Sequence, residues 1–181
     1  EKMKKLVVFL SIVCSLLIVS LTLFSKTVQA ETSKKVDVIT EIKIQNDKGG
    51  ELTTGLGRWD TFRLNAKFEL EGKNVKAGDT TEVVIASPID ITSQDFEIRD
   101  PNITDPKDPN ANLIAKAKVD AKTGKIVLTF TEFVQKKNDV SGSFFFYAAV
   151  NKDKFPNDGD APVKVSVNDK VKFNGKVTSK V

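Results

Sequence analysis

The chain has no histidine and a single cysteine, Cys14. Histidine is the usual general base at neutral pH, and a cysteine thiolate is a common nucleophile. No serine stands in a Gly-x-Ser-x-Gly segment, which is the nucleophile motif of many hydrolases. A pair of carboxylates could serve a glycosidase, but no motif in the sequence places two of them together. We therefore expect a protein that is not an enzyme and that uses no cofactor.

The N-terminal residues have the three parts of a secretory signal peptide. The only methionine, Met3, is followed by two lysines, and residues 6–24 form an uncharged apolar run. Val28-Gln29-Ala30 then offers small residues before a cleavage site. We predict a signal peptide over 1–30, cleavage after Ala30, and an exported protein that is extracellular or on the cell surface. Because the run is long, an uncleaved anchor is the alternative; lipoprotein processing at Cys14 is disfavoured, since that cysteine stands in mid-run.

The exported part carries almost no net charge. The whole chain has 28 basic and 24 acidic residues; without the four lysines and one glutamate that precede Glu31, 24 and 23 remain, a net charge of +1. A net charge near zero indicates no basic surface that would bind phosphate groups. We therefore expect no nucleic-acid partner and, in the mature form, no membrane partner. The exported part also has no cysteine, so disulfides cannot stabilise it, as would suit a Gram-positive surface protein.

The exported part reads as a series of short strands. After a polar leader at 31–35, apolar and polar residues alternate with the period of two that half-buried strands show. No segment predicts a helix, and the proline-containing stretch 100–110 predicts an exposed loop. Strands are expected over 36–44, 62–70, 80–87, 96–98, 113–119, 125–134, 140–150, 163–167 and 171–177. The pattern predicts one all-β domain over 36–181, an antiparallel Ig-like β-sandwich with Greek-key connections and extra strands near 96–119.

Two stretches, 125–134 and 140–147, form the centre of this predicted fold. Both are rich in β-branched and aromatic residues and flank a short polar connector, which is typical of an antiparallel strand pair. One face of the two should fill the core with Ile126, Leu128, Phe130, Val140, Phe144, Phe146 and Val150. The opposite face carries a second apolar row: Val127, Phe133, Phe145 and Tyr147. This row is either a ligand-contacting patch or a surface that a neighbouring module, a loop or an inserted strand covers.

The segments 77–80, 122–125, 129–134 and 139–142 together resemble the N-terminal Ig-like modules of the MSCRAMM adhesins of Gram-positive bacteria. The resemblance is nearest to the first module of the collagen-binding adhesins. A Thr-Phe-Thr-Asp-Tyr-Val-like run is a mark of that family, and here Glu132 replaces the acid and Phe133 the tyrosine. The resemblance implies a variant Ig fold and an adjacent Ig-like module. It also implies an extracellular-matrix partner, collagen or alternatively fibrinogen, held by strand addition at a sheet edge. The sequence shows no second module and no LPxTG-type sorting signal.

Three further features suggest a metal site, a ligand anchor or a covalent cross-link, but each has a simpler explanation or lacks assignable partners. Acidic residues at 95, 97, 100, 105 and 108, and the segment 157–160, could hold calcium, but neither matches an EF-hand loop and solvated loops are commoner, so we assign no metal site. Trp59 is expected in the core or at a packed edge rather than as a ligand anchor. A Lys–Asn isopeptide bond, known in related surface modules, has no assignable partners here.

Two functions of different classes follow. The first is a cell-surface adhesin module that binds a host matrix protein, collagen before others. The second is a non-binding Ig-like spacer or pilus-type module. Carbohydrate binding is a third possibility, which would require exposed aromatic residues on a concave face.

Overall fold

The computed structural model describes residues 32–181. The chain divides into Glu1–Thr32 and Ser33–Val181, and the second unit holds all the strands given below. The predicted signal peptide over 1–30 and its cleavage after Ala30 lie outside the described residues and stay predictions. Within 32–181, no helix has the length and apolar character needed to cross a membrane.

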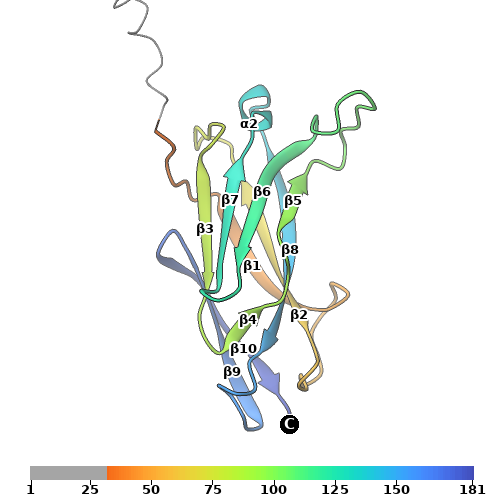
Figure 1. Cartoon of the computed structure of the whole chain (residues 1–181), viewed down its shortest axis with the longest axis vertical. Coiled ribbons are helices and arrows are strands. Elements are labelled where there is room, and N and C mark those ends of the chain that lie inside the picture. Colours follow the sequence, from red (N-terminus) through yellow and green to blue (C-terminus); the bar gives the residue numbers. More distant parts are fainter. Residues whose placement is uncertain (1–31) are drawn as a thin grey trace, which may run out of the picture. The chain divides into compact units, whose positions relative to one another are not determined.

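Ten strands form two antiparallel sheets in Ser33–Val181 (Figure 1). The four-stranded sheet has the order β1-β2-β8-β4, and the six-stranded sheet the order β10-β9-β3-β7-β6-β5. Neighbours in each sheet are often distant in sequence, so the chain crosses repeatedly between the sheets. The strands are β1 Ile39–Asn46, β2 Phe62–Glu69, β3 Thr80–Ile85, β4 Ile89–Ile91, β5 Phe96–Arg99, β6 Leu113–Asp120, β7 Lys125–Phe130, β8 Ser141–Val150, β9 Gly159–Val167 and β10 Lys170–Ser179. The prediction of an all-β antiparallel sandwich is confirmed.

The core lies between the two sheets, and strand alternation explains its composition. On β2, Phe62 and Leu64 are fully buried while Arg63 between them is not. On β9, three alternate valines are fully buried in the same way. Burying a side chain of this size stabilises the fold by about 1.5–3 kcal/mol. The seven core residues predicted from the central stretches are all buried: Ile126, Leu128, Phe130, Val140, Phe144, Phe146 and Val150.

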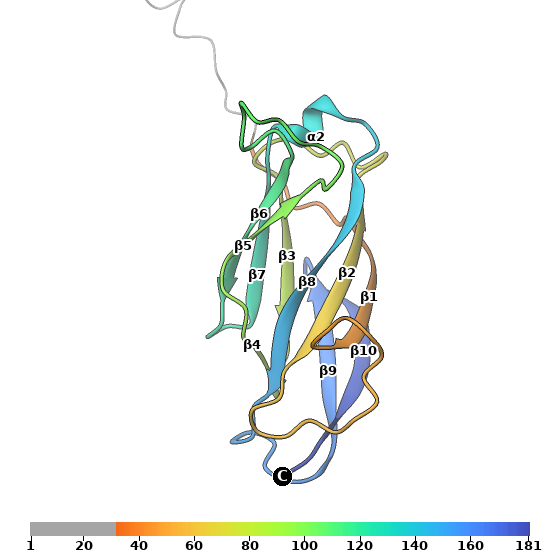
Figure 2. The ribbon, with the colours of Figure 1, turned by 90° about the vertical axis from the view of Figure 1, so that its right-hand side faces the viewer.

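The predicted pairing of the two central stretches is wrong. β7 pairs with β3 and β6, whereas β8 pairs with β2 and β4 in the other sheet. The two strands therefore face one another through the core instead of sharing hydrogen bonds (Figure 2). The error has a physical reason: two strands that bury one face each show the same alternation whether they lie side by side or on opposite sides of a core.

The connector between these strands contains a helical turn, α2 Phe133–Lys136, although the sequence predicted no helix. Thr131 initiates it. Its hydroxyl donates to the carbonyl of Leu113 and accepts the N–H of Phe133 at 3.3 Å. Such a local side-chain bond offers the backbone an alternative to the strand ladder. The strand consequently ends at Phe130, and the buried Phe133 belongs to the helical turn.

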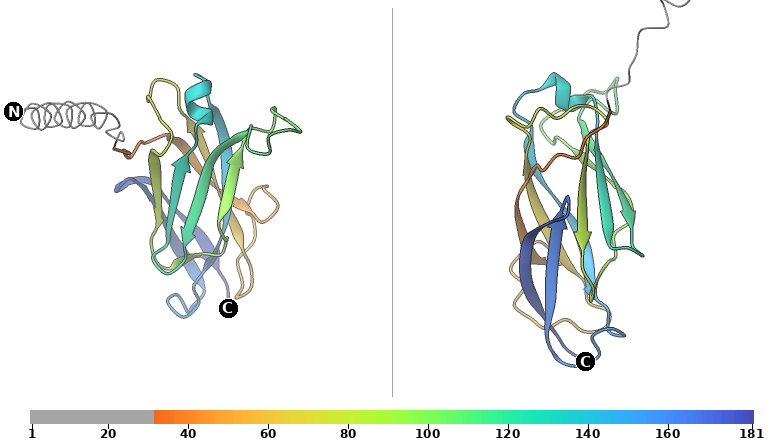
Figure 3. Two further views of the ribbon diagram at one scale, coloured as in Figure 1. Left: turned by 45° about the horizontal axis from the view of Figure 1, so that its top comes forward. Right: turned by 90° about the vertical axis from the view of Figure 1, so that its left-hand side faces the viewer.

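Two tight hairpins have turn residues with positive φ. Gly124, in the β6–β7 turn, has φ +67°, and a Cβ there would lie 2.5 Å from the carbonyl oxygen of Ile85. Asn168 and Asp169 join β9 to β10 with φ of 47° and 69°, and positive φ at both central residues is the mark of a type I′ hairpin turn. The β9–β10 hairpin is drawn in the right-hand view of Figure 3.

Two smaller predictions need correction. No strand was expected over 89–91, but these residues form β4, which follows Pro88 and pairs with β8 in the other sheet. Trp59 is 90% exposed and is neither a core nor an edge-packing residue. It lies in a turn closed by Asp60, whose carboxylate accepts the N–H of Gly57 at 2.7 Å.

Candidate ligand surface beside strand β8

The four residues predicted to form one outward apolar row do not share a surface. Val127 is half-buried on the outer face of the six-stranded sheet, between Glu82 and Lys118 of the neighbouring strands. Phe133 is buried, with 8% exposure. Only Phe145 and Tyr147 lie together, on the outer face of the four-stranded sheet. The expected row is therefore wrong as a geometrical unit, because its members come from two sheets and a helical turn.

Phe145, Tyr147 and Arg63 form what we call the aromatic–arginine cluster. The two rings meet edge to face, with centroids 5.7 Å apart and an interplanar angle of 80°. The guanidinium carbon of Arg63 lies 3.9 Å from the centroid of Phe145 and 5.4 Å from that of Tyr147. Both distances fall within the range of cation–π attraction. Phe145 nevertheless remains 43% exposed, so the cluster presents an aromatic surface to solvent.

Backbone register explains why Arg63 belongs to this cluster. Arg63 on β2 stands directly opposite Tyr147 on β8. Its Nη2 donates to the Tyr147 hydroxyl at 3.3 Å, and its Nε donates to the carbonyl of Asp47 at 3.0 Å. Sequence reasoning missed Arg63. Its outward position in the alternating β2 pattern was visible, but its partner strand was not.

A groove of about 520 Å³ runs beside the cluster, between β8 and β5. Its volume lies within the ~300–1,000 Å³ typical of ligand pockets. Phe96 and the buried Phe144 both line it, and their ring centroids are 6.0 Å apart. The groove is lined by Ser93–Asp95 from the β4–β5 link, by Phe96–Arg99, by Ser143–Phe145 and by Tyr147. Aromatic rings and backbone of two strands thus border one open depression.

The residues that carried the family resemblance near 77–80 have structural partners. The buried carboxylate of Asp79 accepts the N–H groups of Lys34 at 3.1 Å and Lys76 at 2.9 Å. The Gly78 N–H donates to the Phe130 carbonyl at 2.9 Å. These bonds tie the start of β3 to the end of β7, so this motif explains the fold more directly than it explains binding.

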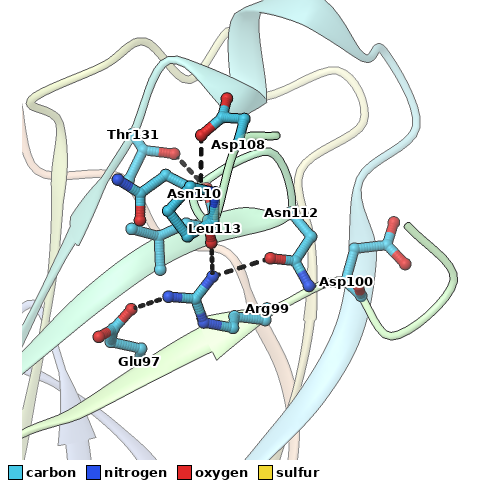
Figure 4. A network of polar contacts seen from close by, with 9 residues as sticks. Glu97, Arg99, Asp100, Asp108, Asn110, Asn112, Leu113 and Thr131 are labelled. Atoms are coloured by element: carbon cyan, nitrogen blue, oxygen red, sulfur yellow. Dashed lines mark hydrogen bonds and ion pairs between the residues drawn. The ribbon is translucent and has the colours of Figure 1, made fainter. Parts of the chain in front are cut away.

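The acidic loop that suggested calcium has its carboxylates engaged by the protein (Figure 4). Glu97 pairs with Arg99 at 2.6 Å, and Arg99 also donates to the Pro109 carbonyl and the Asn112 side chain. The Asp108 carboxylate accepts the N–H of Asn110 at 2.9 Å. In the part of the chain that the structure describes, no group of three or more acidic side chains is arranged to hold a metal ion.

The carboxylate of Asp100, in the same loop, has a lowered pKa. The N–H of Asn102 is the main cause, and the ammonium of Lys137, 3.2 Å away, adds to it against the opposing effect of burial. A hydrogen bond or a cation that favours the charged form lowers the pKa of an acid. Asp100 therefore fastens this loop to the segment after α2.

The buried lysine at the opposite end of the sandwich has no asparagine partner. Lys152 is 8% exposed, and its ammonium donates to the carbonyls of Leu56 at 2.7 Å and Lys180 at 2.9 Å and to the hydroxyl of Ser179. These neutral oxygens satisfy the charge. The arrangement assigns no partners for the isopeptide bond considered from the sequence.

Comparisons with known proteins agree with this architecture. The chain is 26% identical over 164 residues to Clumping factor B of Staphylococcus aureus, a match that spans 88% of this chain and 18% of that protein. It is 31% identical over 100 residues to the Serine-aspartate repeat-containing protein E of the same organism, covering 54% of this chain and 8% of that protein. The chain thus spans less than a fifth of the length of these relatives.

Solved structures support the fold. A serine-rich repeat protein of Streptococcus agalactiae superposes with a TM-score of 0.57 at 22% identity, over 82% of this chain and 46% of that one. The collagen adhesin of S. aureus superposes with a TM-score of 0.52 at 13% identity, over 83% and 45%. The predicted Ig-like sandwich is confirmed, and so is the resemblance to MSCRAMM adhesin modules. A bacterial Ig domain profile matches residues 55–160, and the chain therefore belongs to the bacterial Ig domain family.

Proposed function

We propose that this chain is a module of an exported surface adhesin that binds a host extracellular-matrix protein, with collagen as the first candidate and fibrinogen as the second. The observation that carries the proposal is the aromatic–arginine cluster, which lies exposed beside an open groove. The similarity to Clumping factor B and to solved adhesin structures supports the same class. An adjacent Ig-like module belongs to this proposal, because the chain spans only a small part of those relatives.

The chemistry of the cluster suits a protein ligand. Tyrosine and arginine are enriched among the residues that dominate binding energy at interfaces. The hydrogen bond from Arg63 to Tyr147 and the stacking of Arg63 on Phe145 hold the three side chains in place before binding, which reduces the ordering cost of association. Chains rich in proline dock on aromatic surfaces, so the proline-rich chains of collagen are a chemically reasonable partner.

An enzymatic role is not proposed. The described surface groups aromatic rings, a guanidinium and backbone edges, and the whole sequence has no histidine to act as a general base. We infer a binding protein whose ligand is held without a chemical step.

The rival proposal is a spacer module that binds nothing, and one observation favours it. Arg63 Nε already donates to the Asp47 carbonyl and Nη2 to the Tyr147 hydroxyl, so these polar atoms of the cluster have partners without a ligand. A self-satisfied cluster of this kind could serve only to hold β1, β2 and β8 in register.

Equilibrium binding separates the two. Residues 31–181, which include the whole of the compact unit, would be titrated over immobilised triple-helical collagen, fibrinogen and denatured collagen. Saturable binding that weakens about tenfold or more in Phe145→Ala, the loss of one hot-spot contact of about 1.4 kcal/mol, supports the adhesin. Val127→Ala, on the opposite sheet, is the matched control and should bind as the parent does. Absence of binding to all three matrix proteins would reject this ligand class and favour the spacer.

A further inference from the structure

Most of the buried polar side chains of the sandwich lie beside its first and last segments. Among residues 32–181, five polar or charged residues are buried: Asp79, Thr81, Asp100, Lys152 and Ser179. Burying such groups costs free energy unless each finds hydrogen-bonding partners. Asp100 fastens a loop to the segment after α2. The other four hold the terminal segments of the compact unit, so polar burial is concentrated at these two attachments.

The first attachment, which we call the N-terminal clamp, joins residues 34–36 to the start of β3. The backbone forms an isolated parallel bridge there: the Thr80 N–H donates to the Lys34 carbonyl at 3.0 Å, and the Val36 N–H donates to the Thr80 carbonyl at 2.8 Å. Two buried side chains add to this bridge. The Asp79 carboxylate accepts the Lys34 N–H at 3.1 Å, and the Thr81 hydroxyl donates to the Val36 carbonyl at 2.6 Å.

The second attachment, the C-terminal clamp, joins residues 178–180 to Leu56 in the link between β1 and β2. Another isolated parallel bridge forms there: the Leu56 N–H donates to the Thr178 carbonyl at 2.8 Å, and the Lys180 N–H donates to the Leu56 carbonyl at 2.9 Å. The buried ammonium of Lys152 donates to the carbonyls of Leu56 and Lys180 and to the hydroxyl of Ser179. One cation therefore binds both sides of the bridge.

Each clamp fastens a terminal segment to the sheet to which its own strand does not belong. Residues 34–36 lead into β1 of the four-stranded sheet, yet they bond to β3, an inner strand of the six-stranded sheet. Ser179 ends β10 of the six-stranded sheet, yet it is bridged to the link between two strands of the four-stranded sheet. The clamps therefore tie the two sheets together where the terminal segments join them.

The clamps lie toward opposite ends of the sandwich, and the strands run along its length (Figures 1 and 2). A force that separates the two ends of the unit is consequently directed along the clamped segments. All the bonds of one clamp then share the load, because the segment cannot slide past its partner until they break together. Tension that enters at the N-terminal end also reaches residues 34–36 before it reaches β1.

We propose that the two clamps give this module a load-bearing function: they keep it folded when tension is applied between its ends. Buried charges rarely stabilise a fold at equilibrium more than apolar groups of similar volume would, so their concentration at the clamps requires another reason. Directional bonds that must break before a terminal segment moves supply that reason. The inference needs no ligand, but it rests on the part of the proposed function that makes this chain one module among several.

The test compares two directions of pulling on residues 31–181. The part of the chain that the structure describes has no cysteine, so introduced cysteine pairs define where the force acts. Thr32→Cys with Val181→Cys applies the force through both clamps. Lys122→Cys with Asn138→Cys, at exposed positions beyond the two ends of β7, applies it along the sandwich but bypasses both clamps. Single-molecule stretching at constant force measures the lifetime of the folded state in each case.

Lys152→Met keeps the length of the side chain and removes the cation of the C-terminal clamp. Pulled through its termini, this variant should unfold at least about tenfold faster than the parent, as expected for lost hydrogen bonds to a charged group. Pulled through positions 122 and 138, it should unfold less than about threefold faster. Ile98→Val, a core change on β5 away from both clamps, is the matched control and should speed unfolding by the same factor in both directions.

Thr81→Val provides a second variant that does not depend on the folding of Lys152→Met. It removes only the hydroxyl of the N-terminal clamp and keeps the shape of the side chain. The same preference for pulling through the termini is expected. Equal acceleration in both directions would mean that the clamps only stabilise the fold, and would overturn the inference. A terminal-pulling lifetime as long as that of the parent in both variants would overturn it as well.

The outcomes separate this inference from the proposed function. Directional dependence without binding to any matrix protein would reject the adhesin and keep the load-bearing clamps. Saturable matrix binding by a module whose clamp variants show no directional dependence would reject the clamps as a load-bearing device and keep the adhesin.

Discussion

β7 and β8 resemble each other in sequence and differ in almost every tertiary respect. Both bury alternate apolar residues in the same core. β7 is paired along both edges, and its outer face lies among Glu82, Lys118 and other charged side chains. β8 is open along 141–145, and its outer face carries Phe145 and Tyr147. Two strands whose inner faces are equally buried therefore differ in their outer faces: charged side chains surround that of β7, whereas that of β8 carries aromatic rings.

Alanine substitutions on the inner faces of β7 and β8 should destabilise the fold by similar amounts. Replacing Phe146 of β8 by alanine should lower the free energy of unfolding by about 3–5 kcal/mol, and Leu128→Ala of β7 by about 2–5 kcal/mol, because each leaves a cavity in the shared core. Both residues are almost completely buried. Urea denaturation at constant pH measures the two values. If one variant lost less than about 1 kcal/mol, the two strands would not share one core.

A proline substitution should destabilise the fold more in β7 than at the open part of β8, because β7 is hydrogen-bonded along both edges. Val127→Pro removes an N–H from a strand with neighbours on both sides, and should cost about 1–3 kcal/mol because a ladder hydrogen bond is lost and its partner is left unsatisfied. Ser143→Pro, on the open edge of β8, should cost much less than that. The midpoints of thermal unfolding compare the two directly. Equal destabilisation would mean that the edge of β8 is covered.

Binding should depend on the aromatic–arginine cluster on the outer face of the four-stranded sheet, and not on the outer face of the six-stranded sheet. Arg63→Met keeps the length of the side chain but removes the cation that stacks on Phe145 and bonds to Tyr147. We expect the affinity for the matrix protein that the parent binds to fall about tenfold, and the stability to fall by less than about 1 kcal/mol. Lys118→Met, on the opposite sheet, is the control. Equal losses in the two variants would remove the distinction between the faces.

Acid should remove the stabilisation that the Glu82 ion pairs give the fold on the outer face of the six-stranded sheet. Partial burial raises the pKa of Glu82, but the ammonium groups of Lys35 and Lys125, both 3.3 Å away, outweigh it and leave the pKa below its ordinary value. The ion pairs therefore stabilise the fold fully above the unfolded pKa of about 4.3, and their contribution is lost as the pH falls through the lower folded pKa.

Glu82→Gln provides the comparison for this smallest effect. The difference in unfolding free energy between the parent and Glu82→Gln should be less than about 1 kcal/mol at neutral pH, because both lysines are substantially exposed. It should shrink toward zero in acid. Denaturation curves between neutral pH and about pH 3 test this, and a difference that grew on acidification would contradict the assignment.

Much of the sandwich could be predicted because burial and alternation are local. Phe62 to Phe68 on β2 and the valines of β9 show the period of two without reference to any other residue. Turn chemistry at Gly124 and at Asn168-Asp169 is equally local. The helical turn at Phe133 was missed because Thr131 sets it through a carbonyl on another strand, that of Leu113. Local patterns do not report such distant partners.

The candidate site was only half predictable. Phe145 and Tyr147 were identified as surplus outward aromatic residues, but Val127 and Phe133 were grouped with them although they lie elsewhere. Arg63 was missed, since only the β2–β8 register places its guanidinium over Phe145. The groove could not be predicted either, because β5 and β8 belong to different sheets and local patterns do not show how two sheets pack.

The sequence by itself determined which residues of the regular strands enter the core and where the tight hairpins turn, because a strand has only two faces and each turn type needs particular residues. The tertiary structure alone decided which strands became neighbours. Hydrogen-bond ladders are made between backbones that are alike in every strand, so sheet order depends on long-range packing. The resulting strand order left β8 without a neighbour along 141–145 on one side. It also brought Arg63 of β2 beside Phe145 and Tyr147 of β8, which is the proposed binding surface.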